Sequence, residues 1–192
     1  MSISQINLAV YSFPMEVYLV QHGEANDEKE DAEKPLTDKG VKDVQRVAGE
    51  LEKVGIKAPH IMHSGKTRAR QTAEIFSRSL GPSEVREMLG LSPNDNPKMA
   101  KEFLESAKSP VMVVGHLPHL SKLASLMITG SPEPETVRFQ MGGVVCLEKG
   151  EKWVLKWALT PQITPIPIKE LFPMGARRDR AAGRTAHQHS LP

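Results

Sequence analysis

Apolar, strand-like segments alternate with amphipathic, helix-like segments between residues 15 and 160. The strand-like segments are short runs of mainly Val, Ile, Leu and Met that stop at glycine, proline or polar residues. They span 16–21, 60–64, 110–115, 143–149 and 152–159, and the last two are spaced as a hairpin that turns at Gly150 and Glu151. Strand and helix in alternation predict parallel strands joined by right-handed crossovers. We therefore expect an α/β fold, a three-layer α/β/α sandwich with a mostly parallel central sheet.

The helix-like segments carry their own start and stop signals. Thr37 is expected to cap a helix that Gly55 ends, and Asn96 followed by Pro97 opens another. Two more helices are expected from about Lys66 to Leu80 and from Pro118 onward. The predicted buried stripes are Val41, Val44, Val47, Ala48, Leu51 and Val54; Ala69, Thr72, Ala73 and Phe76; Met99, Phe103, Leu104 and Ala107; and Leu120, Leu123, Ala124, Met127 and Ile128.

Length and composition favour one globular domain with tails. The chain has 192 residues, of which 39% are hydrophobic and 25% charged, which is enough apolar material for a core. We expect an extension over 1–14, the domain over 15–160, and a Pro-rich, then basic, disordered tail over 161–192. That tail carries five basic and two acidic side chains, so its net charge of +3 exceeds the +2 of the whole chain. The basic excess therefore does not indicate a nucleic-acid partner.

No segment has the length and apolarity of a membrane span, and residues 1–14 lack the pattern of a secretory signal. We accordingly expect a cytoplasmic protein without a membrane partner. The single cysteine, Cys146, lies in an apolar run and is interpreted as a core residue. Trp153 and Trp157, four residues apart in a strand, are expected to share one face of the sheet.

Unusual polar residues follow three of the predicted strands. His22 follows the first, Arg68 lies just after the second, and His116 follows the third. Parallel strands place their carboxyl ends at one edge of a sheet, so these side chains are expected to meet. A guanidinium group matches phosphate oxygens, and a neutral imidazole can attack phosphorus. The pattern therefore indicates phosphoryl chemistry.

Several short motifs then resemble those of the histidine phosphatase superfamily, which includes the cofactor-dependent phosphoglycerate mutases. They occur in the family's order at residues 19–25 (Leu-Val-Gln-His-Gly-Glu-Ala), 35–37 with Gly40, 64–69 with 71–73, and 113–116 (Val-Val-Gly-His). The short chain and the early Pro-Leu-Thr motif are most similar to the SixA-type phosphohistidine phosphatases. The resemblance covers about residues 15–160 and implies a phosphoglycerate mutase-like fold.

The resemblance also implies roles for particular residues. His22 would be the nucleophile that becomes phosphorylated, and Arg68 and His116 would hold the phosphoryl oxygens. Gly23 would let the backbone approach the phosphate closely. Gln21 stands where the family usually has arginine, so this phosphate contact would lack a charge. No metal and no cofactor are implied.

The implied function is hydrolysis of phosphohistidine on a protein, such as a phosphorelay domain. Two alternatives stay open: a general small-molecule phosphomonoesterase, and a low-activity phosphate-binding adaptor, which the uncharged Gln21 suggests. The proton donor is also open, with Glu24 and Glu87 as candidates. Because imidazole is a better leaving group than an alkoxide, a phosphohistidine substrate would depend less on such a donor. The pairs His60 with His63 and His116 with His119 lack the accompanying carboxylates that would indicate a metal site.

Overall fold

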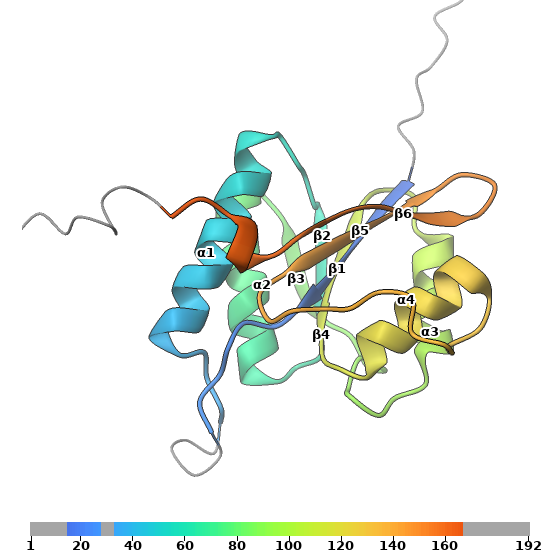
Figure 1. The fold of residues 1–192 in the computed structure, drawn as a ribbon, viewed down its shortest axis with the longest axis horizontal. Coiled ribbons are helices and arrows are strands. Elements are labelled where there is room, and N and C mark those ends of the chain that lie inside the picture. Colours follow the sequence, from blue (N-terminus) through green and yellow to red (C-terminus); the bar gives the residue numbers. More distant parts are fainter. Residues whose placement is uncertain (1–14, 28–32, 167–192) are drawn as a thin grey trace, which may run out of the picture.

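The computed structural model describes residues 15–27 and 33–166, which form one α/β body (Figure 1). Its elements, in chain order, are β1 (Met15–Gln21), α1 (Asp38–Lys53), β2 (His60–His63), α2 (Thr67–Leu80), β3 (Glu84–Glu87), α3 (Pro97–Ser106), β4 (Val111–Gly115), α4 (His119–Thr129), β5 (Val144–Lys149), β6 (Trp153–Leu159) and the 3-10 turn η1 (Pro161–Ile163).

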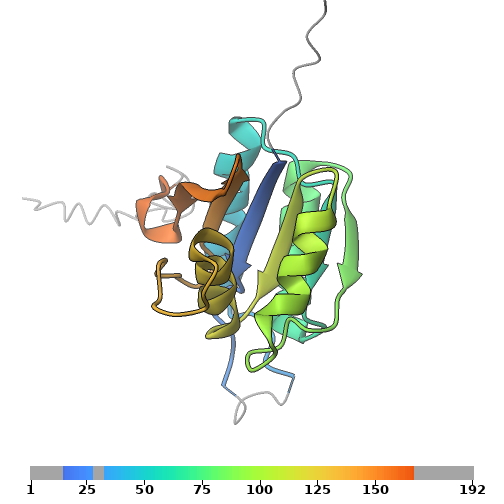
Figure 2. The ribbon, with the colours of Figure 1, turned by 90° about the vertical axis from the view of Figure 1, so that its right-hand side faces the viewer.

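The strands form one six-stranded sheet in the order β3-β2-β4-β1-β5-β6. β3, β2, β4 and β1 are parallel, whereas β5 runs antiparallel to β1, and β6 runs antiparallel to β5. Figure 2 shows the arrowheads of the parallel strands at the same end of the molecule. The predicted α/β/α sandwich with a mostly parallel sheet is confirmed.

Helices cover both faces of the sheet, and each face has its own apolar cluster. One face of β1 packs Tyr18 and Val20 among residues of α1 and α2, including Val44 and Phe76. The other face packs Val17 and Leu19 among residues of α3 and α4. β1 and β4 are therefore buried on both sides, which explains their continuous apolar sequences.

The predicted helix starts are confirmed. The Thr37 hydroxyl accepts the Gly40 N–H (2.9 Å) at the start of α1, and the Asn96 side chain accepts the Lys98 N–H (3.0 Å) at the start of α3. Each cap satisfies a backbone donor that the helix itself leaves unpaired. The α1 cap also fixes the direction in which the chain leaves the loop after β1.

The predicted burial of two residues in the helix stripes is wrong. Val54 lies beyond the end of α1 and is 72% exposed, because the helix ends at Lys53. Met99 is 46% exposed on α3, where Ala100 and Leu104 take the buried positions. The short strand β3 was not predicted at all, since its sequence, Glu-Val-Arg-Glu, has one apolar residue.

Trp153 and Trp157 do not share a face of the sheet. The register between β5 and β6 shifts between Cys146 and Leu147, so that Cys146 pairs with Trp157 while Leu147 pairs with Leu155. This β-bulge reverses the alternation of side chains along β6. Trp153 accordingly packs with the α3 and α4 cluster, and Trp157 packs against the α1 and α2 cluster.

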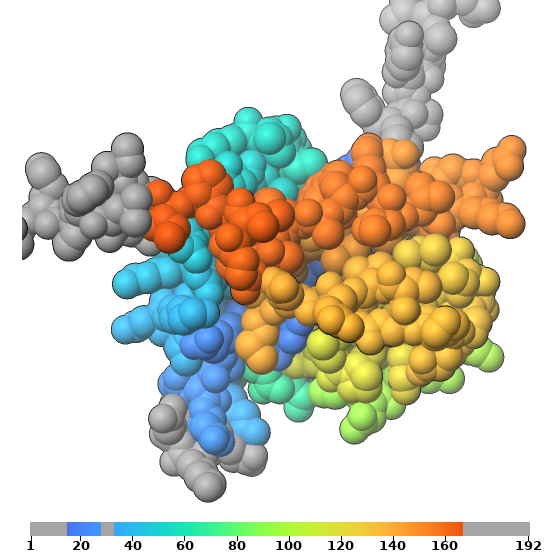
Figure 3. Space-filling view, viewed as in Figure 1, coloured from blue at the N-terminus to red at the C-terminus, as the bar shows by residue number. Residues whose placement is uncertain are grey.

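The chain continues along α1 after β6. Pro161 and Thr164 are buried, and the Thr164 hydroxyl donates to the Pro161 carbonyl (2.8 Å). Figure 3 shows residues 161–166 in dark orange on the face of the molecule toward the viewer. Residues 161–166 are thus part of the folded body, whereas the predicted extension 1–14 and the rest of the predicted tail, 167–192, lie outside the described residues. Among the described residues, no helix is long and apolar enough to cross a bilayer.

Candidate active site

The carboxyl ends of β1, β4 and β2 meet at one edge of the sheet. Gln21 pairs with Gly115, and His63 pairs with Val114, so the next residues of the three strands lie at the same level. These residues are His22, His116 and Ser64. The structure thus brings together the two histidines that the sequence predicted, and adds a serine to them.

His22 is held in the orientation and tautomer of a nucleophile. Its Nδ1 lies 2.7 Å from the Gly23 carbonyl oxygen, which can only accept a hydrogen bond, so Nδ1 carries the proton. Nε2 therefore carries the lone pair. The pKa of His22 is lowered to about 4, mainly by burial; the Gly23 hydrogen bond opposes this shift and the Arg68 charge adds to it. The imidazole is consequently neutral at physiological pH.

Arg68 reaches His22 from the first turn of α2. Its Nε donates to His22 Nε2 over 3.2 Å. Burial lowers the pKa of the guanidinium, but an arginine side chain stays protonated in proteins. Arg68 is therefore a fixed positive charge directly beside the candidate nucleophile.

His116 lies against His22, with the ring centroids 4.8 Å apart and the planes tilted by 53°. Its Nε2 is 2.6 Å from the Ser64 hydroxyl, while its buried Nδ1 has no hydrogen-bond partner within the described chain. The pKa of His116 is lowered to about 3, mainly by burial and also by the nearby His22, Arg68 and Lys66. With Ser64 donating to Nε2, the buried Nδ1 would carry a proton and be a donor without a partner in the described chain.

Backbone contacts fix the loop that carries His22. The Gly23 N–H donates to the Thr72 hydroxyl of α2 (3.1 Å), which in turn donates to the Arg68 carbonyl (2.8 Å). On the other side, the Gly142 N–H lies 2.9 Å from the Gln21 carbonyl and 3.1 Å from that of His22. The nucleophile loop is thus tied to α2 and to the segment before β5.

Glycine is required where this loop crosses α1. A Cβ on Gly23 would lie 2.8 Å from Val44 Cγ2, and a Cβ on Gly40 would overlap the Glu24 carbonyl oxygen. Gly23 therefore serves the close approach of loop and helix, and its φ lies outside the left-handed region.

The Gln21 side chain forms no hydrogen bond with the three central side chains, those of His22, Arg68 and His116, among the described residues. It is 7% exposed, and its Oε1 is buried without a hydrogen-bond partner in the described chain. A role for Gln21 in holding phosphate stays a prediction.

The two candidate proton donors differ in their surroundings. Glu24 accepts hydrogen bonds from the Thr37 hydroxyl (3.1 Å) and from Lys39 Nζ (3.1 Å), so it is engaged at the start of α1. Glu87, at the end of β3, lies over Gly65, where a Cβ would overlap its carboxylate. Glu87 is the better placed of the two, because it lies beside the Ser64 loop.

Sequence reasoning missed three residues that organise the site. Ser64 and Thr72 lay within the recognised motifs, but nothing showed that their hydroxyls contact His116 and Gly23. Gly142 gave no signal, because it is distant in sequence and acts through its backbone.

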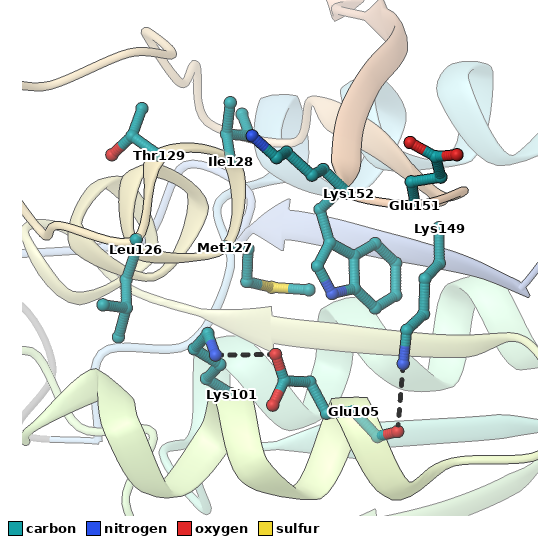
Figure 4. A pocket seen from close by; sticks show the side chains of 11 residues that line it. Lys101, Glu105, Leu126, Met127, Ile128, Thr129, Lys149, Glu151 and Lys152 are labelled. Carbon is teal, nitrogen blue, oxygen red and sulfur yellow. Dashed lines mark hydrogen bonds and ion pairs between the residues drawn. The ribbon is translucent and has the colours of Figure 1, made fainter.

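Two further pockets lie away from this edge. One, of about 340 Å³, is formed by the ends of α3 and α4 and by the β5–β6 hairpin (Figure 4). Lys149 lines it and pairs with Met15, so it lies at the opposite end of the sheet, and its Lys101 is already paired with Glu105 (2.6 Å). The other, of about 430 Å³, is lined mainly by apolar residues of α1, β6 and the segment after β6. Neither contains the histidines, and the described residues hold no cluster suited to a metal ion.

Comparison with known proteins agrees with this geometry. The sequence model of the histidine phosphatase superfamily (branch 1) matches residues 17–101. An uncharacterized protein of Picosynechococcus sp. is 32% identical over 144 residues, which cover 71% of this chain and 86% of that protein. The chain belongs to the histidine phosphatase superfamily.

Other similar proteins match over a shorter segment or at lower identity. The Escherichia coli protein named "Probable phosphoglycerate mutase GpmB" is 39% identical over 72 residues, 35% of this chain and 33% of that protein. Among solved structures, the protein histidine phosphatase SixA complexed with tungstate superposes with a TM-score of 0.69 at 24% identity, covering 77% of this chain and 98% of that one. A phosphoserine phosphatase of Entamoeba histolytica gives a TM-score of 0.57 at 16% identity over 76% of this chain and 97% of that one. At these identities, the structural likeness establishes the fold.

Proposed function

We propose that the protein is a phosphatase that removes the phosphoryl group from phosphohistidine on another protein. The observation that carries this proposal is the arrangement of His22, whose Nε2 lone pair is oriented by the Gly23 carbonyl and lies 3.2 Å from the Arg68 guanidinium. A neutral, oriented imidazole beside a fixed positive charge is suited to attack phosphorus.

The reaction would proceed in two displacements. His22 Nε2 forms a bond to phosphorus while the P–N bond to the substrate imidazole breaks, and the electron pair of that bond leaves with the imidazole. Arg68 and His116 hold the phosphoryl oxygens, where negative charge is spread in the transition state. A water molecule then attacks phosphorus, the bond to His22 breaks, and inorganic phosphate is released.

Two features favour phosphohistidine over a phosphate ester. The leaving imidazole can take a proton on its other nitrogen before the bond breaks, so it needs no strong acid from the enzyme. Two of the loops at this edge are also short: β2 is followed by Ser64–Lys66 and β4 by His116–Pro118 before the next helices. Short loops leave His22 within reach of a protein surface.

A second candidate function, hydrolysis of small phosphate esters, is favoured by one observation. The Glu87 carboxylate lies over Gly65, next to Ser64, at the edge that carries the histidines. An alkoxide leaving group requires a proton, and Glu87 could supply it. If esters are the substrates, Glu87→Gln should lower their hydrolysis by roughly 100-fold and leave phosphohistidine hydrolysis nearly unchanged.

The test compares two substrates with one protein. A phosphohistidine-bearing phosphotransfer domain and p-nitrophenyl phosphate are each incubated with the parent protein and with His22→Ala. We expect the domain to lose its phosphoryl group only with the parent. Rapid ester hydrolysis without turnover of the domain would favour the esterase, and binding of the phosphorylated domain without any turnover would favour the adaptor.

A further inference from the structure

A histidine side chain closes the turn that follows β2. His63, the last residue of β2, is 6% exposed, and the Met88 N–H after β3 donates to its carbonyl (2.9 Å). The His63 ring accepts the Gly65 N–H at Nδ1 over 3.1 Å. The two displacements proposed for the reaction do not involve this ring, although Ser64 is the next residue in the chain.

The hydrogen bond from Gly65 defines the tautomer of His63. A backbone N–H can only donate, so Nδ1 carries the lone pair and Nε2 carries the proton. The pKa of His63 is lowered, mainly by burial; Glu87 and Glu74 oppose this shift and Arg70 adds to it. The ring is therefore neutral at physiological pH, and Nδ1 remains an acceptor.

The turn from residue 63 to residue 65 has the pattern of an Asx turn. In such a turn, the side chain of an Asn or Asp accepts a hydrogen bond from the backbone two residues further on, and here an imidazole takes that part. Gly65 has a φ of 80°, in the left-handed region, and a Cβ there would overlap the Glu87 carboxylate. The turn thus combines a side-chain acceptor at His63 with a glycine at 65.

Two contacts of the candidate active site lie on either side of this turn. The Ser64 hydroxyl lies 2.6 Å from His116 Nε2. α2 begins directly after the turn, and from its first turn Arg68 Nε donates to His22 Nε2. Lys66, the N-cap residue of α2, makes no side-chain capping hydrogen bond, so the preceding turn has to fix where the helix begins. A displaced turn would therefore move both the serine and the arginine.

We infer that His63 is a positioning residue, whose Nδ1 closes the turn and thereby holds Ser64 against His116 and Arg68 against His22. No hydrogen bond in the described part of the chain joins the His63 ring itself to the two site histidines or to Arg68. Its effect therefore passes through the backbone of the turn. Because the groups it positions are those of the proposed phosphoryl transfer, its effect on turnover rests on the proposed function.

Two amide substitutions distinguish the two ring nitrogens of His63. The Oδ1 of an asparagine can take the place of Nδ1 as acceptor, whereas the amide of a glutamine lies one bond further out, near the place of Nε2. His63→Asn should therefore keep the turn and His63→Gln should lose it, although both place an amide at the same buried position. The matched control is His60→Gln at the other end of β2, where the imidazole is 40% exposed and lies 3.3 Å from Glu84.

The first measurement is kcat and KM on a phosphotransfer domain phosphorylated on histidine. We expect His63→Gln to lower kcat roughly tenfold at a nearly unchanged KM, because the displaced groups act on charge that is spread in the transition state. His63→Asn and His60→Gln should stay within about twofold of the parent. A parent-like kcat for His63→Gln would overturn the inference. An equal loss in both His63 variants, or a loss confined to His63→Asn, would overturn it as well.

The second measurement does not depend on turnover. Nitrogen NMR of the His116 ring reports which nitrogen carries the proton. The parent and His63→Asn should show a protonated Nδ1 and an Nε2 that accepts from Ser64, whereas His63→Gln should shift toward a mixture of the two tautomers. An unchanged His116 spectrum in His63→Gln would overturn the positioning role. If the spectra differ as expected but the parent leaves the phosphorylated domain intact, the proposed function fails while the positioning of Ser64 by His63 stands.

Discussion

Arg68 and Arg70 show how position decides the role of an arginine. Both lie on α2, but Arg68 Nε bonds His22, whereas Arg70 is exposed and 3.9 Å from Glu74. We predict that Arg68→Ala lowers kcat/KM on phosphohistidine by roughly 10- to 100-fold, since a charge-assisted hydrogen bond contributes about 1.5–3 kcal/mol. Arg70→Ala should leave kcat/KM within about twofold, because exposed ion pairs contribute little. Equal effects of the two variants in steady-state kinetics would contradict the role given to Arg68.

Burial determines how the two site histidines titrate. Their pKa values lie near 4 for His22 and near 3 for His116, because the charged imidazolium forms lose hydration. We predict that the NMR ring signals of both, assigned with His22→Gln and His116→Gln, stay constant from pH 7.5 to 5. Inorganic phosphate at saturation should move both titrations to higher pH, because an adjacent anion favours the imidazolium. A midpoint near 6.5 in the free protein would contradict the buried, neutral pair.

Among the elements, α1 contains two glycines with opposite requirements. Gly40 faces the Glu24 carbonyl, where a Cβ would overlap, whereas a Cβ on Gly49 would meet nothing within 4 Å. We predict that Gly40→Ala lowers the free energy of unfolding by about 1–3 kcal/mol and reduces activity by displacing the nucleophile loop. Gly49→Ala should instead stabilise the protein by about 0.5–1 kcal/mol, because alanine is the better helix former. Urea denaturation measures the free energy of unfolding of both variants. A stable, fully active Gly40→Ala variant would contradict the close approach of the Glu24 carbonyl to α1 at Gly40.

The elements with clear periodicity could be predicted from the sequence, and with them the site. Apolar runs ending at His22 and His116 fixed two of the strand ends, and the parallel order followed from the alternation with helices. β3 could not be predicted, because an edge strand paired on one side carries charged residues and lacks periodicity. The opposite faces of Trp153 and Trp157 could not be predicted either, since a β-bulge depends on pairing between strands and leaves no pattern in one of them.

For hydroxyl and backbone contacts, the sequence shows residue types but not partners. Ser64 contacts His116 across 52 positions in the chain, and Gly23 contacts Thr72 across 49. These contacts exist only once the sheet and α2 have formed. The three catalytic candidates were therefore predictable from local patterns, whereas the groups that orient them required the fold.

For the whole molecule, the buried histidines make stability depend on pH. His22, His63, His116 and His119 all have pKa values below the usual 6.5, so the unfolded chain binds more protons than the folded protein between pH 6.5 and about 4. The contribution of these four histidines to the free energy of unfolding is present in full above pH 6.5. It falls as the pH drops toward 4. We predict that the free energy of unfolding in urea is lower at pH 5 than at pH 7 by on the order of 2 kcal/mol for His22 alone. His22→Gln should reduce that difference, and an unchanged difference would contradict the buried neutral state of His22.

The covalent intermediate offers the most direct test of the account. The protein is mixed with a phosphohistidine-bearing domain, quenched in alkali within milliseconds, and mapped by mass spectrometry for phosphate that is stable in alkali and labile in acid. We predict such phosphate on His22 of the parent and none on His22→Ala. Phosphate on a different residue, or undiminished hydrolysis by His22→Ala, would contradict the assignment of His22 as the nucleophile.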